Sequence, residues 1–243
     1  AEPRFEALIL ADLAWLGIPG DGPLRRQSDC RPAYAAALGR LQALGVVYPC
    51  FCTRGAIARE LEAMADAPQG PDGPLYPGTC RRLPPGERAE RLAAGESCAY
   101  RLDVAAALRL PGTRGLCFEE RGAGPAGETG TIAVLPHLLG DIVLGRKDLG
   151  TSYHLACVVD DAATDVTLVT RGNDLHAATH VQRLLQALLG LPAPAYRHHR
   201  LVTDASGRRL AKRDRDLTLR VLREAGATPG DIRRQVGLGP HLG

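Results

Sequence analysis

The sequence predicts an α/β fold in which a loop-rich segment with short strands interrupts a core of helices and strands. Helical spacing of apolar residues marks 4–16, 32–44 and 175–189, and short apolar or β-branched runs mark strands between and after these helices. A proline- and glycine-rich stretch over 67–87 divides the chain. With 243 residues, 45% of them hydrophobic, the chain can form one large or two modest domains with a core.

Two helices open the chain. The first, over 4–16, ends before the Pro19–Gly20 pair, and the second, over 32–44, ends at Gly45. In each, leucines and aromatic residues recur at helical spacing, which predicts a helix.

The strand candidates are short runs rich in apolar residues. They lie at 46–48, 98–102, 141–145, 153–159 and 166–170. The Asp160–Asp161 pair is expected to form the turn between the last two, and the glycine-rich stretch 122–130 a turn between short strands. Beyond 217, the pattern predicts two short helices separated by Gly226 and Pro229.

Composition excludes several classes of protein. The net charge of +3 and the 4% aromatic content do not favour a protein that binds nucleic acid by global charge or by stacking many bases. We find no apolar run long enough for a membrane span and no signal peptide. The seven cysteines are an odd number without a disulfide spacing, so we expect a cytoplasmic protein with no membrane partner.

Cysteines on either side of the proline-rich stretch form a candidate metal site. Cys50 and Cys52 are two residues apart and Cys80 lies across the loop, a donor set that suits zinc. A fourth ligand could come from Tyr76, from water or from Cys98. The alternative is that these cysteines are small buried hydrophobic residues.

Arg171 lies in the segment 169–174, at the expected carboxyl end of a strand and beside a glycine, where open α/β sheets bind ligands. Its guanidinium group could hold a carboxylate through two parallel hydrogen bonds. The alternative is a structural ion pair with Asp160, Asp161 or Asp174. For the paired aspartates themselves, a turn or cap role is favoured over a magnesium site.

A basic segment follows over 196–215. It contains seven arginines and lysines around a glycine, a pattern typical of a loop that faces phosphate groups. Lys212 is notable because the chain has Lys147 as its only other lysine. The alternative is a solvated basic turn.

Together these segments resemble the class I glutamyl-tRNA synthetase family, and within it the short glutamyl-Q tRNA(Asp) synthetases. The resemblance rests on four segments in order: the zinc-site pattern of Cys50, Cys52, Tyr76 and Cys80; the Ser152–Asp161 block; the Val169–Leu175 block; and Arg209, Leu210, Ala211, Lys212 and Arg213, which resemble a KMSKS-type loop.

The resemblance implies a reaction in two steps. ATP, with Mg²⁺, activates L-glutamate to glutamyl-adenylate without tRNA, and the glutamate is then transferred to queuosine at the wobble position of tRNA(Asp). It also implies roles for individual residues. Tyr153 and Arg171 bind glutamate, Lys212 stabilises the charge on the ATP phosphates, and Cys50, Cys52, Tyr76 and Cys80 hold one structural zinc ion.

The resemblance further implies a class I Rossmann-like core with a zinc-containing insertion and a short helical tail, acting as a monomer. The expected divisions are the remainder of the first Rossmann half (1–46), the inserted domain (47–145), the second Rossmann half (146–200), and the KMSKS-like loop with its tail (201–243). The sequence departs from the family in two ways. We find no HIGH-type motif, so we expect the first Rossmann unit to be missing, and Ala211 replaces the usual serine.

Two alternatives remain open at this point. One is a fragment of an ordinary glutamyl-tRNA synthetase, although that family has a large anticodon-binding region and a different zinc pattern. The other is an inactive zinc-containing RNA-binding remnant, which would bind tRNA without activating glutamate.

Overall fold

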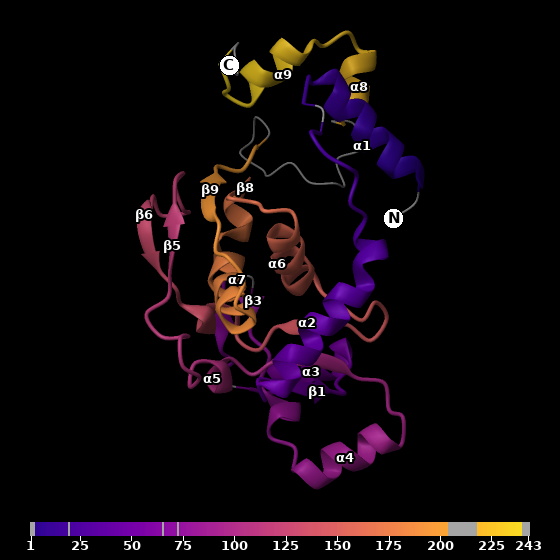
Figure 1. Cartoon of the computed structure of the whole chain (residues 1–243), viewed down its shortest axis with the longest axis vertical. Coiled ribbons are helices and arrows are strands. Elements are labelled where there is room, and N and C mark those ends of the chain that lie inside the picture. Colours follow the sequence, from indigo (N-terminus) through magenta and orange to yellow (C-terminus); the bar gives the residue numbers. More distant parts are fainter. Residues whose placement is uncertain (1–2, 19, 65, 72, 204–217, 240–243) are drawn as a thin grey trace. The chain divides into compact units, whose positions relative to one another are not determined.

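The computed structural model describes residues 3–18, 20–64, 66–71, 73–203 and 218–239. The chain divides into two compact units (Figure 1). The larger comprises Cys30–Arg200, and the smaller combines Ala1–Asp29 with Leu201–Gly243. All the described candidate site residues lie in the larger unit.

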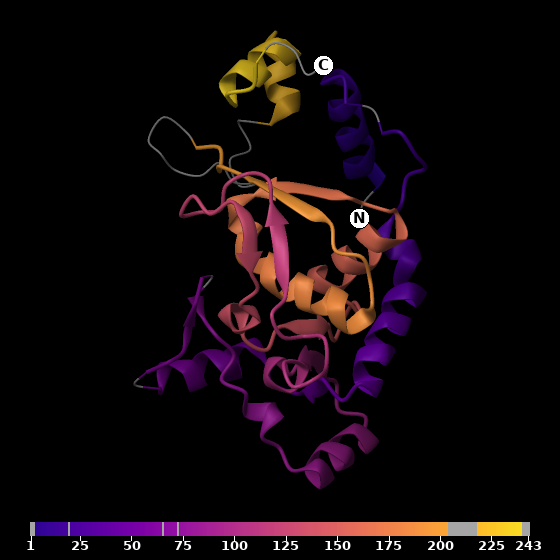
Figure 2. The same cartoon turned by 60° about the vertical axis from the view of Figure 1, so that its left-hand side comes forward.

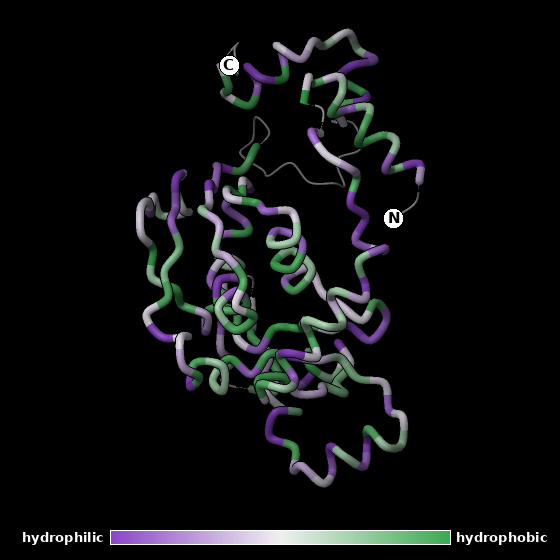
Figure 3. The backbone as a smooth tube through the Cα atoms, in the orientation of Figure 1, coloured by the Kyte–Doolittle hydropathy of each residue, from purple (hydrophilic) through white to green (hydrophobic). Residues whose placement is uncertain are grey.

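Three helices form the centre of the larger unit. They are α2 (Arg31–Ala43), α6 (Tyr153–Ala163) and α7 (His176–Leu189), which pack against one another. Hydrophobic residues make up much of α6 and α7, as their green stretches show (Figure 3). Leu41 and Leu155 are completely buried in this core. Burial of such side chains stabilises each helix more than its intrinsic propensity does.

A four-stranded sheet lies against α7. Its strand order is β6 (Gly130–Ala133), β5 (Cys117–Glu120), β9 (Ala195–His199), β8 (Leu168–Gly172). Strands β8 and β9 are parallel, and α7 makes the crossover between them (Figure 2). The register sets Arg171 opposite His198. The carboxyl ends of both parallel strands therefore meet at one edge, where ligands bind in this class of sheet.

A second sheet, antiparallel throughout, carries the cysteines. It consists of β1 (Val47–Cys50), β4 (Ala99–Leu102) and β7 (Val143–Gly145). The buried Asp141 carboxylate accepts hydrogen bonds from the Tyr48 hydroxyl at 2.7 Å and from Arg81 Nη1 at 2.8 Å. Asp141 thus joins this sheet to the segment that carries Cys80.

Short elements complete the chain, and two strands among them pair as a third, two-stranded sheet. They are η1 (Gln27–Cys30), α3 (Arg54–Glu62), β2 (Gln69–Gly70), β3 (Gly73–Pro74), η2 (Thr79–Arg81), α4 (Pro85–Ala93), α5 (Val104–Ala107), η3 (Pro136–Leu139) and η4 (Asn173–Leu175). In the smaller unit, α1 (Pro3–Trp15) is joined to the tail helices α8 (Leu219–Glu224) and α9 (Pro229–Gln235). Arg233 of α9, for example, donates to the Leu16 carbonyl at 3.0 Å.

Most of the predicted elements are confirmed. The helices expected at 4–16, 32–44 and 175–189 correspond to α1, α2 and α7, and the tail contains two short helices. Strands occur at four of the five predicted places, and 122–130 connects β5 with β6. No helix among the described residues is long and apolar enough to cross a membrane.

The strand predicted over 153–159 is wrong, because these residues form the start of α6. A short apolar run fits a buried strand and a buried helix equally well. Leu155, Ala156 and Val158 are all buried here, so the run carries no alternation to distinguish the two. For the same reason the expected Asp160–Asp161 turn is wrong. Both aspartates lie in the last turn of α6, where Asp160 accepts a hydrogen bond from the Tyr34 hydroxyl at 2.7 Å.

Candidate active site and metal centre

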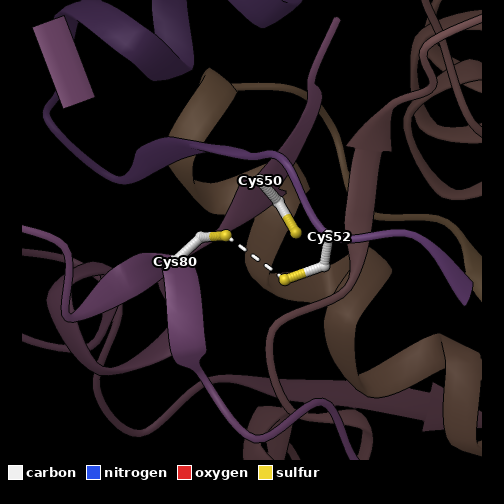
Figure 4. Close-up of side chains that lie close together, drawn as sticks. All are labelled: Cys50, Cys52 and Cys80. Atoms are coloured by element: carbon white, nitrogen blue, oxygen red, sulfur yellow. Dashed lines mark hydrogen bonds between the residues drawn. The ribbon is translucent and has the colours of Figure 1, made fainter. Parts of the chain in front are cut away.

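Three cysteines come together between β1 and η2. Cys50 ends β1, Cys52 follows two residues later, and Cys80 lies in η2. Their three sulfur atoms lie within 4.8 Å of one another, with their side chains turned inward (Figure 4). The Cys52 and Cys80 sulfurs are 3.4 Å apart. The structure thus brings together the three cysteines that the sequence selected.

The Tyr76 hydroxyl completes this group. Its oxygen is 3.4 Å from the Cys50 sulfur and 3.5 Å from the Cys52 sulfur. Around a tetrahedral zinc ion, Zn–S bonds of about 2.3 Å and a Zn–O bond of about 2.0 Å separate two sulfurs by about 3.8 Å and a sulfur from an oxygen by about 3.5 Å. The three printed distances are close to these values, and thiolates with a tyrosine oxygen are donors that could hold a zinc ion. Cys98 packs against this cluster without belonging to the close sulfur group.

Backbone contacts fix the cluster. The Phe51 N–H donates to the Cys80 sulfur at 3.4 Å, and the Cys80 N–H donates to the Tyr76 hydroxyl at 2.9 Å. Lys147 Nζ donates to the Phe51 carbonyl at 3.0 Å, between the first two cysteines. Burial raises the pKa of Cys52 to about 11. At Cys80, burial acts in the same direction, but hydrogen bonds from Tyr76 and Phe51 outweigh it and lower the pKa of the thiol.

The second candidate site is at the carboxyl end of β8. The Arg171 guanidinium group donates from Nη1 to Gln182 Oε1 at 2.7 Å, from Nε to His198 Nε2 at 3.2 Å and from Nη2 to the Thr179 hydroxyl. Among the described residues, these three side chains hold Arg171, and the expected alternative of an ion pair with Asp160, Asp161 or Asp174 is not observed. These contacts use three of its five N–H groups, and Tyr153 is also close enough to interact with the guanidinium.

Tyr153 lies beside Arg171, as the sequence reasoning requires. Burial raises the pKa of the Tyr153 hydroxyl, the nearby Cys157 thiol adds to this, and the Arg171 guanidinium opposes it. The ring is nevertheless 46% exposed, so it can contact a ligand. Burial also raises the pKa of Asp161, again against the effect of Arg171. The tyrosine and the arginine are therefore close enough to interact, although they come from different elements.

A cavity of about 470 Å³ opens next to Tyr153. Three arginines line it: Arg54, Arg101 and Arg146. Ser152, the residue at the N-terminus of α6, also lines it with a buried hydroxyl that has no hydrogen-bond partner. Asp141 also lines the cavity and Arg146 is paired with Asp148, but the arginines outnumber the carboxylate in the lining, which favours an anionic ligand here. Tyr76 and Tyr153 both border this cavity, which therefore lies next to one residue of each candidate site, whereas Arg171 does not line it.

Glu120, His176 and His198 form another group of close donor atoms. Two of these three are already engaged with each other, because His198 Nδ1 is 2.5 Å from Glu120 Oε2. The other ring nitrogen of His198 faces the Arg171 cation. A metal ion would have to displace both contacts and sit beside a fixed positive charge, so this group is not a candidate metal centre.

Sequence reasoning missed the residues that hold Arg171. Thr179 and Gln182 are three residues apart on the inner face of α7, and polar residues on the buried face of an amphipathic helix were the available signal. No sequence pattern indicated Glu120, because it reaches this site through the pairing of β5 with β9. The loop residues Arg209, Leu210, Ala211, Lys212 and Arg213 lie outside the described residues.

Comparison with known proteins identifies the family and the fold. The family model of the class I tRNA synthetases (E and Q), catalytic domain, matches residues 1–238. The chain belongs to this family, whose members are aminoacyl-tRNA ligases. Within the family it is similar to proteins named glutamyl-Q tRNA(Asp) synthetase. It is 47% identical to the one from Rhodobacter capsulatus, over 98% of this chain and 84% of that protein, and 43% identical to the one from Nocardia farcinica, over 95% and 67%.

Solved structures give the same class of fold. The chain resembles a glutamate tRNA ligase from Elizabethkingia meningosepticum, determined in complex with its amino acid, with a TM-score of 0.68 and 25% identity. The matched region covers 88% of this chain and 43% of that ligase. The predicted class I synthetase catalytic fold is thereby confirmed. The zinc-containing insertion, the missing first unit and the four domain ranges stay predictions.

Proposed function

We propose that this protein activates L-glutamate with ATP, without tRNA, and transfers the glutamate to queuosine at the wobble position of tRNA(Asp). The observation that carries the proposal is the convergence of Tyr153 and Arg171 at the carboxyl end of β8. The names of the most similar relatives supply the acceptor.

Arg171 suits a carboxylate ligand for a geometric reason. Its guanidinium group is fixed by Thr179, Gln182 and His198, which use three of its five N–H groups. A planar pair of donors fits the two oxygens of a carboxylate. Because the guanidinium is positioned before the ligand arrives, little entropy is lost on binding. Tyr153 offers a hydroxyl beside it.

In the first step, an oxygen of the glutamate α-carboxylate attacks the α-phosphorus of ATP, and pyrophosphate leaves. The protein's contribution to such a reaction is positioning and stabilisation of the developing charge. We assign Lys212 to the charge on the phosphates, with Mg²⁺ bound to ATP. In the second step, a hydroxyl of queuosine attacks the mixed anhydride, and AMP leaves.

The tRNA must reach the bound glutamate along a positively charged surface. The arginine-lined cavity beside Tyr153 supplies one within the larger unit, because Arg54, Arg101 and Arg146 border it. We assign this cavity to the phosphate backbone of the tRNA loop that carries queuosine.

We further propose that Cys50, Cys52, Tyr76 and Cys80 hold one zinc ion. Four protein donors leave no open position, so the ion has a structural role and supplies no chemistry to glutamate activation. It would fasten the proline-rich segment against β1 beside the arginine-lined cavity.

The test is exchange of labelled pyrophosphate into ATP. The proposal predicts exchange that depends on glutamate and needs no tRNA, followed by transfer of glutamate to tRNA(Asp) that carries queuosine but not to the unmodified tRNA. Transfer to the 3′ end of tRNA(Glu) would instead identify a fragment of an ordinary glutamyl-tRNA synthetase. Binding of tRNA without exchange would identify an RNA-binding remnant.

A further inference from the structure

We infer that Glu120 and His198 are positioning residues for glutamate binding, because they fix the tautomer that lets His198 accept a hydrogen bond from Arg171. This inference rests on the proposed function, in which Arg171 holds a carboxylate of glutamate. It assigns a role to two buried residues that do not reach the ligand themselves.

The Glu120 carboxylate is completely buried, and three hydrogen bonds occupy it. Oε1 accepts the backbone N–H groups of His198 at 2.9 Å and Gly122 at 2.8 Å. Oε2 is 2.5 Å from His198 Nδ1. A carboxylate can only accept, so His198 Nδ1 must carry the proton.

The consequence appears at the other ring nitrogen. With its proton on Nδ1, a neutral imidazole presents an acceptor at Nε2. Two donors converge there, Arg171 Nε and the Thr179 hydroxyl, each at 3.2 Å. Thr179 in turn accepts from Arg171 Nη2. The hydrogen bonds therefore have one consistent direction, from the guanidinium through the imidazole to the carboxylate.

Protonation of His198 would reverse its role, because an Nε2–H group cannot accept from Arg171. The groups that face His198 are Glu120 on β5, Arg171 on β8, and His176 and Thr179 on α7. Burial lowers the pKa of His198, and Arg171 and His176 act in the same direction against Glu120. His198 is therefore neutral at pH 7, as the positioning role requires.

Glu120→Gln is the sharpest variant. The two backbone N–H groups hold the amide oxygen in the place of Oε1, so the amide NH₂ must face His198 Nδ1. That nitrogen must then accept, the ring proton moves to Nε2, and a donor points at Arg171 Nε. The shape of the side chain is nearly unchanged. Glu119→Gln is the matched control, because Glu119 is the exposed neighbour on β5.

Two measurements on the folded chain test the inference. The first is NMR of the histidine ring nitrogens and of the Arg171 Nε–H, which needs no ligand. The second is calorimetric titration with glutamate and, separately, with ATP. For Glu120→Gln we expect the His198 proton on Nε2, faster exchange of the Arg171 Nε–H and glutamate binding weakened about tenfold to a hundredfold, as for loss of a hydrogen bond to a charged group. ATP binding and the Glu119→Gln variant should be unchanged.

If Glu120→Gln does not fold, two substitutions of His198 provide a second test. His198→Gln keeps an acceptor near Nε2, whereas His198→Asn keeps only the donor toward Glu120, so glutamate should bind more weakly to the asparagine variant. The inference is overturned by a proton on Nε2 in the unaltered chain, or by unchanged glutamate affinity in folded Glu120→Gln. If the unaltered chain binds no glutamate, the proposed function fails, and the Arg171 Nε–H exchange still decides the positioning role.

Discussion

Replacement of Cys80 by serine removes the ligand that ties the proline-rich segment back to β1. Cys52 and Cys80 are 28 positions apart, and their sulfurs are 3.4 Å from each other. If the metal acts as a cross-link, the loop-closure entropy for this separation corresponds to about 3.6 kcal/mol at 25 °C. That is a large part of the roughly 5–15 kcal/mol by which a typical domain is stable.

The assay combines metal analysis with urea unfolding. We expect about one zinc ion per unaltered chain and almost none in Cys80→Ser, because a serine hydroxyl is a poor zinc ligand. The free energy of unfolding should fall by about 3–4 kcal/mol. A chelator should lower the unaltered chain to the level of the variant and leave the variant unchanged.

Cys98→Ser is the matched control, because Cys98 packs against the cluster but lies outside the close sulfur group. It should retain zinc. Full zinc content in Cys80→Ser, or equal loss in Cys98→Ser, would refute the four-ligand assignment. A small loss of stability that the chelator does not reproduce would favour buried cysteines without a metal.

Three further predictions concern the active site and the core. Arg171→Ala should weaken glutamate binding about tenfold to a hundredfold and leave ATP binding unchanged, measured by calorimetry against exposed Arg197→Ala; equal loss of both ligands would count against it. Lys212→Ala should slow pyrophosphate exchange more than it weakens glutamate binding, and an unchanged exchange rate would remove Lys212 from the reaction. Burial lowers the pKa of His180 to about 4, so the folded state binds fewer protons than the unfolded state, and stability should fall by about 1–3 kcal/mol as the pH drops from 7 to 4.5. Urea titrations should show a smaller pH effect in His180→Gln, and an identical one would contradict this assignment.

Amphipathic periodicity predicted α7 well, because its buried face repeats over four turns. The same criterion failed over 153–159, where Leu155, Ala156 and Val158 are all buried and show no alternation. The pattern of residues alone could not supply the preference for a helix there. Packing of α6 against α2 and α7 supplied it.

The two candidate sites differed in how far the sequence could predict them. Spacing and residue type selected Cys50, Cys52 and Cys80, because few residues other than cysteine form a metal site with this spacing. From the residues alone, Tyr76 was one of three candidates for the fourth ligand, and the resemblance to a family selected it. The structure brings it to within 3.5 Å of two sulfurs.

The partners of Arg171 could not be predicted in this way. Thr179 and Gln182 contact it from a helix, and the register of two parallel strands brings His198 to it. Glu120 lies on a third strand and contacts His198. Each contact depends on tertiary pairing, which no local pattern encodes.

The central claim is that Tyr153 and Arg171 form a site that activates glutamate before any tRNA binds. Pyrophosphate exchange by the purified chain, with glutamate and ATP and with all RNA removed, measures this directly. We predict exchange with L-glutamate that is absent with glutamine or aspartate and is abolished in Arg171→Ala. Exchange that requires added tRNA, or that is equally fast without glutamate, would contradict the account.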